Sequence, residues 1–373
     1  MAAKKKTTEG DAETRVASVL ASDWMKAIKK KYGGNIVEVA SEAHSTTIHR
    51  IPTGIFALDL ALGGGFAAGR VNTVYGAKSS GKTTAVLKAI GTAQKLCAVC
   101  FTPNEGGCAC GEQRAAVAAF IDIEGTFEKT WAETHGVDMS RLLLTRPEYA
   151  EQGLDIAEAM LRSNECDLVA IDSIAFLTSM KEIEKSTEDD MMGQQARTLG
   201  KGIRKFVSAL NQLANENSGR KPTILLVNQL RMKIGVMFGN PETQPGGMAP
   251  GFAASTETKC WAGKYKMDEG TGRPMYAGMN FRVEKNKTAA ARMEGEYNLV
   301  LSETATKKVG QIYDEPLIVS LAEKIGLLER KGGQYECLGR TFRIKEDVET
   351  GLLTDPTFSS ELRTTLMKVL LAG

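Results

Sequence analysis

The sequence lacks the features that mark membrane, secreted or strongly basic proteins. No apolar run approaches the roughly 20 residues that a membrane-spanning helix needs. Lys4–Lys6 are not followed by an apolar segment, so we expect no secretory signal and predict a cytoplasmic protein without a membrane partner. The 47 basic and 45 acidic residues leave a net charge of only +2, so a nucleic-acid site must be a local patch.

A glycine-rich segment, GAKSSGKTT, lies between a β-rich run at Val71–Tyr75 and a helical pattern at Thr84–Leu96. It fits G-x-x-x-x-G-K-[ST], the pattern of a phosphate-binding loop in its strand–loop–helix context. Its glycines let backbone N–H groups approach phosphate oxygens, and the helix N-terminus adds its dipole. We predict a nucleotide site in which Lys82 meets the β- and γ-phosphates and Thr83 ligates Mg²⁺. The predicted lining residues are Gly76, Ser79, Ser80, Gly81, Lys82, Thr83 and Thr84.

Two acidic residues follow apolar strands. Leu168–Ile171 runs into Asp172, and Phe120–Ile123 runs into Glu124. Asp172 is predicted to hold Mg²⁺ through water, and Glu124 to orient and deprotonate the attacking water. A solvated strand end is the alternative for either acid alone, but open α/β sheets bind ligands at the carboxyl ends of their strands.

A long loop follows the apolar strand Thr223–Val227 and the amides Asn228 and Gln229. The loop is rich in glycine, methionine and basic residues, and loops of this length are usually functional or disordered. Gln229 is expected to touch the γ-phosphate, so that hydrolysis changes the shape of the loop. This pattern suits a sensor that couples the nucleotide to a second ligand.

The second ligand is predicted to be DNA. The helical stretch 193–213 carries three cations on one face, and the long loop adds two more. They are Arg197, Lys201 and Arg204 at i, i+4 and i+7, followed by Arg231 and Lys233. A solvated basic stripe is the alternative, but beside a nucleotide-sensing loop we favour sequence-tolerant, salt-sensitive DNA binding.

These segments resemble the RecA family of homologous-recombination strand-exchange ATPases, from about Trp24 to the end of the chain apart from one insertion. The resemblance is carried by IPTGIFALDLALGGG (Ile51–Gly65), GAKSSGKTT, IDIEGTF (Ile121–Phe127), AIDSIAFLT (Ala170–Thr178), NQLRMKIGVMFGNPET (228–243) and VEKNKTA (Val283–Ala289). It implies an α/β fold, with a RecA-like P-loop core, a mostly parallel central sheet, an N-terminal helix–strand arm and a small C-terminal α/β domain. The implied function is an ATP-dependent recombinase that forms a filament on single-stranded DNA and exchanges strands with duplex DNA.

The resemblance implies roles for several positions of the nucleotide site. Glu124 matches the catalytic glutamate, Asp172 the Walker B acid and Gln229 the γ-phosphate sensor. Trp131 and Glu128 fall where the family contacts adenine. A further pair, Lys285 and Lys287, resembles the lysines that reach a neighbouring subunit's phosphates, which would bury ATP between protomers.

The resemblance also implies two DNA loops, at Met180–Met192 and Leu230–Met248. Met192, Ile234 and Met237 look like the apolar residues that pack against bases. The first loop is acidic, which is unexpected for a DNA contact. Single-strand-binding and loader proteins are the protein partners that the resemblance suggests.

The insertion contains four cysteines: Cys97, Cys100, Cys108 and Cys110. A C-x₂-C followed by C-x-C across a turn predicts four sulfur ligands at one tip, which suits a structural Zn²⁺. Two disulfides, a redox pair or unliganded thiols are the alternatives, and the cytosol disfavours disulfides. Cys166, Cys260 and Cys337 are isolated and predicted to lie in or near the core.

Three parts of the chain are predicted. Residues 1–45 form a basic tail, disordered to about residue 14, and an oligomerisation arm with a helix at Asp23–Tyr32 and a strand at Ile36–Val39. Residues 46–303 form the ATPase core, with the cysteine hairpin at 97–110. Residues 304–373 form a C-terminal DNA-binding lobe, with helices at Leu317–Leu328 and Ser360–Leu371 and a β-hairpin at Gln334–Ile344.

The sequence departs from the family near the end of the second DNA loop. Gly251 stands where the family usually has a basic residue, and Glu257 replaces a usual arginine. Both belong to the inter-subunit surface that transmits the nucleotide state.

The alternative functions are a branch-migration motor or helicase, and a filament that promotes repressor self-cleavage. Intact Lys82, Glu124 and Asp172 argue against an inactive ATPase.

Overall fold

The computed structural model describes residues 9–33, 37–39, 48–103, 108, 110–112, 114–184, 193–216, 219–232 and 242–372. Within these ranges, none of the helices is long and apolar enough to cross a membrane.

A nine-stranded sheet forms the centre of the molecule, with strand order β13-β12-β11-β10-β3-β7-β6-β4-β5. The six strands from β10 to β5 run parallel to their neighbours, whereas β11, β12 and β13 pair antiparallel. This confirms the predicted mostly parallel sheet. The strands are β3 (Val71–Gly76), β4 (Ala118–Asp122), β5 (Leu142–Thr145), β6 (Leu168–Asp172), β7 (Thr223–Gln229), β10 (Thr256–Met267), β11 (Pro274–Asn286), β12 (Glu294–Val300) and β13 (Ile312–Tyr313).

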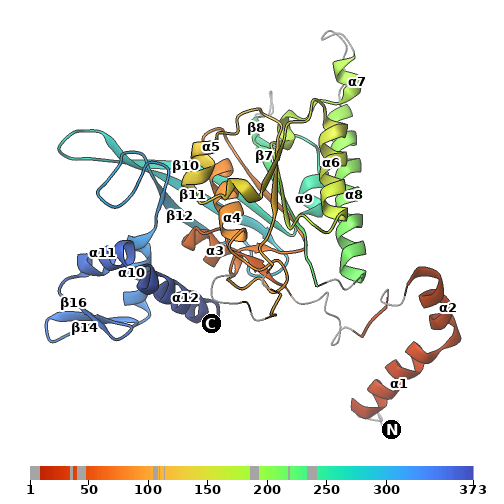
Figure 1. Ribbon diagram of the computed structural model, residues 1–373, viewed down its shortest axis with the longest axis horizontal. Coiled ribbons are helices and arrows are strands. Elements are labelled where there is room, and N and C mark those ends of the chain that lie inside the picture. The colour runs from red at the N-terminus through yellow and green to blue at the C-terminus, as the bar shows by residue number, and fades with distance from the viewer. Residues whose placement is uncertain are drawn as a thin grey trace, which may run out of the picture.

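Helices cover both faces of this sheet (Figure 1). Alternate residues of β7 point to opposite faces: Leu225 and Val227 pack in the apolar cluster with α4, and Ile224 and Leu226 in the cluster with α6 and α8. A strand that is buried on both faces has apolar residues at successive positions. This explains why the sequence TILLV shows no alternation of apolar and polar residues. The helices of the core are α3 (Phe56–Leu62), α4 (Lys82–Ala93), α5 (Lys129–Thr134), α6 (Ala150–Arg162), α7 (Met180–Ile183), α8 (Gln194–Asn215) and α9 (Ala249–Ala253), with short 3₁₀ turns at Met139–Arg141 and Ile174–Phe176.

Short strand pairs complete the core. β1 (Arg50–Ile51) pairs with β2 (Phe66–Ala67), and β8 (Arg231–Met232) pairs with β9 (Glu242–Thr243). The second pair joins the two ends of the long loop after Gln229, so the loop leaves and re-enters the core at one place.

The C-terminal lobe has its own apolar cluster, which also includes Phe56 of α3. It contains α10 (Glu315–Lys324), β14 (Leu328–Lys331), β15 (Gln334–Cys337), β16 (Arg340–Phe342), α11 (Lys345–Thr354) and α12 (Pro356–Ala372). The predicted hairpin and final helix are confirmed. The helix predicted to reach Leu328 was too long, because Gly326 at φ +76° follows its end and Leu328 begins a strand. The α11 helix was not predicted, and the boundary at residue 304 stays a prediction.

The N-terminal arm agrees with the prediction only in part. The helix α2 (Asp23–Tyr32) has the predicted bounds. The prediction of disorder to about residue 14 was wrong from Glu9 onward, because α1 (Glu9–Ala21) contains the good helix formers alanine, glutamate and leucine. Residues 37–39 form no strand, and Ile36 lies outside the described residues.

Candidate functional site

Four neighbouring strands, in the order β3-β7-β6-β4, end at the same edge of the central sheet. Their carboxyl ends deliver the phosphate-binding loop, Gln229, Asp172 and Glu124. Because these strands are parallel, side chains far apart in the sequence meet at this edge. The structure therefore brings together the four predicted elements of the nucleotide site.

The phosphate-binding loop needs glycine at both ends. A Cβ at Gly76 would lie 2.0 Å from the carbonyl oxygen of Cys260, and a Cβ at Gly81 would lie 2.7 Å from the hydroxyl of Tyr297. Gly81 also has φ +78°, a conformation that glycine adopts without strain. The loop thus keeps its backbone close to the sheet and starts α4 at Lys82.

Lys82 is buried at the start of α4. Its Nζ donates to the carbonyl oxygen of Ala77 at 2.6 Å, and the Ser80 hydroxyl donates to the same oxygen at 2.8 Å. Burial lowers the pKa of Lys82, while the carboxylates of Asp172 and Glu124 oppose that shift. The ammonium group is thus held inside the loop, and its contact with phosphate stays a prediction. Ser79 is exposed, and Thr84 is buried on the inner side of α4.

A hydroxyl and a carboxylate meet next to Lys82. The Oγ1 of Thr83 donates to Oδ2 of Asp172 at 2.5 Å. Burial raises the pKa of Asp172 to about 6, although the hydrogen bond from Thr83 opposes the rise. Oxygen donors of this type suit Mg²⁺, and a nearby dication would favour the ionised form of the acid. The two predicted magnesium residues are therefore adjacent and chemically suitable.

Glu124 is held by two donors from neighbouring strands. Its Oε1 accepts from Nε2 of Gln229 at 2.8 Å and from the hydroxyl of Ser173 at 2.6 Å. The predicted base and the predicted sensor are thus in direct contact. Ser173 was missed by the sequence reasoning, although it directly follows Asp172, because a serine after a strand has no pattern of its own.

Asp122 was also missed. It is buried, and its carboxylate accepts from the backbone N–H groups of Thr126 and Phe127 at 3.1 Å and from Nε of Arg146 at 3.0 Å. These bonds fix the turn that carries Glu124. The signal that could have indicated Asp122 is the pair of acids at alternate positions, Asp122 and Glu124, in the sequence FIDIE.

The predicted adenine contacts lie at α5. Glu128 caps this helix, because its carboxylate accepts from the backbone N–H groups of Thr130 at 2.9 Å and Trp131 at 2.5 Å. Trp131 is half-buried and packs edge-on against His135, with ring centroids 5.0 Å apart. Their contact with adenine stays a prediction.

The two lysines predicted to cross a subunit interface lie near the end of β11. Nζ of Lys285 donates to the carbonyl oxygens of Gly251 at 2.6 Å and Phe252 at 3.3 Å. Lys287 is exposed. The contact of the two lysines with another protomer stays a prediction.

The predicted DNA-binding cations are exposed where the structure describes them. Arg197, Lys201 and Arg204 lie on the solvent side of α8, and Arg231 is exposed in β8 with one weak bond from Nη2 to the carbonyl oxygen of Ala175 at 3.4 Å. Met192, Lys233, Ile234 and Met237 lie outside the described residues. DNA contact by these residues stays a prediction.

The four cysteines of the insertion gather in one cluster, with all four sulfur atoms within 4.8 Å of one another. Sγ of Cys110 lies 3.6 Å from that of Cys97 and 3.3 Å from that of Cys108. Tetrahedral zinc, with Zn–S bonds of about 2.3 Å, separates its sulfur ligands by about 3.8 Å. The cluster therefore has the size of a zinc site and is too open for disulfides, which need about 2.05 Å. Cys166, Cys260 and Cys337 are buried, as predicted.

Comparison with known proteins gives a consistent result. The family model of the RecA N-terminal domain matches residues 20–105 and 107–306. Protein RecA of Francisella philomiragia is 34% identical over 352 residues, which cover 93% of this chain and 88% of that protein. Protein RecA of a Nocardioides species is 34% identical over 368 residues, covering 98% and 93%. Protein RecA of Fusobacterium nucleatum is 35% identical over 332 residues, covering 87% and 80%.

Proposed function

The chain belongs to the RecA family of DNA-dependent ATPases that exchange homologous strands in recombination and repair, and from this premise we propose how its residues act. Strand exchange requires that nucleotide state and DNA binding be coupled. The observation that carries the proposal is the contact between Gln229 and Glu124, because it joins the hydrolytic residue to the strand that continues into the long loop.

The nucleotide is held by the loop between β3 and α4. Backbone N–H groups of this loop and the ammonium group of Lys82 bind the phosphates. Thr83 and Asp172 hold Mg²⁺, which neutralises phosphate charge when bound. The adjacent position of these two side chains supports this assignment.

Hydrolysis is assigned to Glu124. Its carboxylate orients a water molecule toward the γ-phosphate and accepts a proton from it. Gln229 leaves Glu124 for the γ-phosphate when ATP binds, which moves the start of the DNA loop. Loss of the γ-phosphate reverses this movement and weakens DNA binding.

DNA is bound by the exposed cations of α8 and by the loop that begins at Arg231. We assign contacts to phosphate groups and base faces, so the affinity does not depend on sequence. The active form is a homo-oligomeric filament in which Lys285 and Lys287 approach the neighbour's nucleotide. Loader and single-strand-binding proteins are the further partners of this proposal.

Zinc is assigned to the four-cysteine cluster as a structural ion. The separations of the sulfur atoms support this assignment. We also place the protein in the cytoplasm, where its seven cysteines stay reduced.

Purified protein should contain one zinc per chain, measured by mass spectrometry. Cys108→Ser should lose the metal, and Cys166→Ser should keep it. Zinc-free wild-type protein with four titratable thiols in this cluster would contradict the assignment.

The function is tested by strand exchange between circular single-stranded and linear duplex DNA. Wild type should form joint molecules with ATP and Mg²⁺, and Gln229→Ala should bind ATP normally yet form few of them. Unwinding of a preformed branched DNA without joint-molecule formation would contradict a recombinase and favour a branch-migration motor.

A further inference from the structure

A cavity lies between the ATPase core and the C-terminal lobe. Its volume is about 590 Å³, and it is lined by residues of α3, α4, α12, the loop before α3 and the segment around β13. Cavities of this size accommodate small organic ligands. Any occupant would touch both α4, which begins at the phosphate-binding loop, and the C-terminal lobe.

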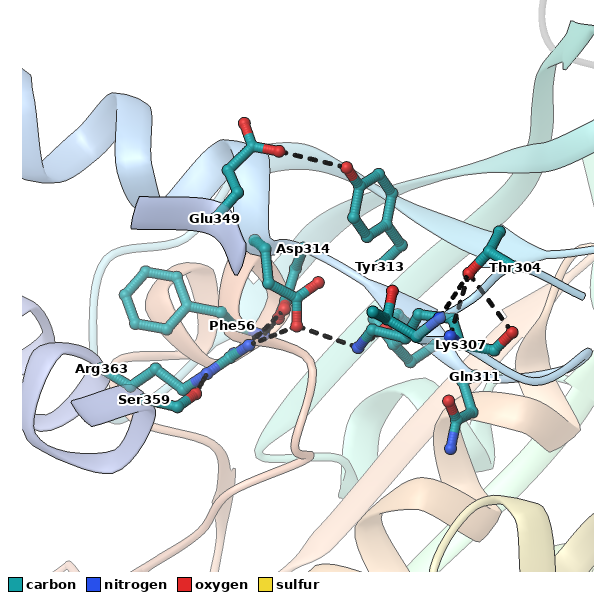
Figure 2. A network of polar contacts seen from close by, with 12 residues as sticks. Phe56, Thr304, Lys307, Gln311, Tyr313, Asp314, Glu349, Ser359 and Arg363 are labelled. Atoms are coloured by element: carbon teal, nitrogen blue, oxygen red, sulfur yellow. Dashed lines mark hydrogen bonds and ion pairs between the residues drawn. The ribbon is translucent and has the colours of Figure 1, made fainter. Parts of the chain in front are cut away.

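The carboxylates of this cavity already have donors. The two oxygens of Asp59 accept from the backbone N–H groups of Thr53 at 2.5 Å and Gly54 at 3.1 Å. Asp314 accepts from both terminal nitrogens of Arg363 at 2.7 and 2.9 Å and from the backbone N–H of Phe56 at 3.1 Å. Figure 2 shows Arg363 of α12 reaching across the junction to Asp314, beside Phe56. The acids are therefore satisfied by local donors.

The cations that line the cavity outnumber the acids that line it, and two of these cations have ammonium groups without a polar partner among the described residues. Lys307 donates to Glu315 and to the carbonyl oxygen of Ile312, both at 2.9 Å. Lys88 and Lys368 also line the cavity, and the ammonium group of neither makes a hydrogen bond or ion pair with any residue that the structure describes. Four cations thus line the space against two carboxylates, and Glu315 adds a third carboxylate beside Lys307 and Arg363.

Lys88 is the more informative of the two free cations, because it is partly buried on α4. Burial lowers its pKa, and the nearby charges of Lys95, Lys307 and Arg363 lower it further, with only Asp314 among the main contributors acting in the opposite direction. A partly buried ammonium group among other cations is unfavourable unless an anion accompanies it.

The remaining walls are mostly apolar. Phe56, Ile312, Met367 and Leu371 line the cavity beside the free cations, together with Thr92 and Thr364. We propose that this junction cavity binds a small, multiply charged anion, a phosphate or a polycarboxylate, between Lys88 of α4 and Lys368 of α12. A bound anion tightens the contact between the ATPase core and the C-terminal lobe. A duplex backbone is a poorer candidate, because Lys88 lies within the junction and not on the outer surface.

The test uses the full chain with saturating ADP and Mg²⁺, so that the phosphate-binding loop is filled. Binding of inorganic phosphate and of citrate is measured by isothermal titration calorimetry at constant ionic strength. At least one of the two should bind saturably to wild type, and the one that binds identifies the class of anion. Lys88→Met should weaken that binding at least tenfold, whereas Lys324→Met, which removes an exposed charge of α10 that does not line the cavity, should not.

Thermal unfolding provides a second measurement, which distinguishes the loss of the anion site from the loss of the fold. Lys88→Met should melt at or above the temperature of wild type without anion, because a poorly compensated cation has been removed, and the anion should no longer raise its melting temperature. Equal anion binding by wild type and Lys88→Met would overturn the proposal. So would an effect that sodium chloride reproduces at the same ionic strength, since that would be charge screening only.

Discussion

At the scale of single residues, the hydroxyl of Ser173 is the least expected part of the site. It is fully buried and donates to the same oxygen of Glu124 as Gln229 does. If Gln229 moves to the γ-phosphate, Ser173 is the donor that still aims the carboxylate. We therefore consider Ser173 a positioning residue that acts through Glu124.

Replacement of Ser173 tests this role. Ser173→Ala should lower kcat about tenfold with little change in KM for ATP, because a hydrogen bond to a charged group contributes about 1.5–3 kcal/mol. Ser173→Thr, which keeps the hydroxyl, should restore most of the wild-type kcat. Equal kcat values for Ser173→Ala and wild type would mean that Ser173 only fills space.

Asp59 predicts a pH dependence of stability. Burial raises its pKa to about 7, against the hydrogen bonds from Thr53 and Gly54. Because folding raises the pKa of this acid, its contribution to the free energy of unfolding decreases as the pH rises from the unfolded pKa of about 4 to the folded pKa of about 7. The melting temperature of wild type should therefore fall between pH 5 and pH 7.5 by more than that of Asp59→Asn. Parallel curves for the two proteins would contradict this assignment.

At the scale of elements, the long loop is tied to the sheet by Gln244. Its Oε1 accepts from Nδ2 of Asn228 at 3.2 Å, and its Nε2 donates to Oε1 of Glu257 at 2.8 Å. Glu257 is the residue predicted to replace the family's usual arginine. Its side chain has a structural role, because it links β10 to the end of the long loop and to the neighbour of Gln229.

This link predicts an effect on DNA coupling. Glu257→Ala should lower the ratio of ATPase rates with and without single-stranded DNA several-fold, because the loop end loses its anchor. Glu257→Gln should keep most of the ratio, since its amide oxygen still accepts from Gln244. Steady-state phosphate release measures both. A full ratio in the alanine variant would show that coupling does not pass through this contact.

The cysteine hairpin belongs to the same scale, because it connects α4 to β4. The backbone N–H of Cys97 donates to Thr102, and Cys97 forms an isolated β-bridge with Ala115. A metal here would close a loop between the helix that carries Lys82 and the strand that leads to Glu124. Removal of zinc by a strong chelator should lower the melting temperature by about 5 °C or more. Cys108→Ser should melt at the chelated value and be insensitive to the chelator, and equal melting of wild type before and after chelation would contradict a structural metal.

At the scale of the whole molecule, the sequence predicted which strand ends meet at the candidate nucleotide site, because the pattern that marks each strand end is local. The loop at Gly76–Thr84 and the acids after β4 and β6 are defined by strand ends, and parallel strands bring such ends together. Ser173 and Asp122 could not be assigned in this way, because their roles depend on which strands become neighbours. The junction of Asp59, Asp314 and Arg363 joins residues about 50 to 300 positions apart, so no local pattern indicates it.

The errors at the ends of the chain have a local cause. The basic run Lys4–Lys6 suggested a disordered tail, but the helix formers from Glu9 onward outweighed it. Leu328 continued an apolar helical pattern, yet Gly326 ended the helix before it. The three apolar residues assigned to DNA, Met192, Ile234 and Met237, all lie outside the described residues, and those assignments stay predictions.

The most direct test of the account is the rate of ATP hydrolysis with and without single-stranded DNA, in wild type and in Glu124→Gln. Wild type should be stimulated strongly by DNA, and the variant should bind ATP and DNA but hydrolyse at least a hundredfold more slowly, because its amide cannot accept the proton of the attacking water. Rapid hydrolysis that DNA does not change would contradict the coupling assigned to Gln229 and the loop. Undiminished hydrolysis by Glu124→Gln would remove Glu124 from the mechanism.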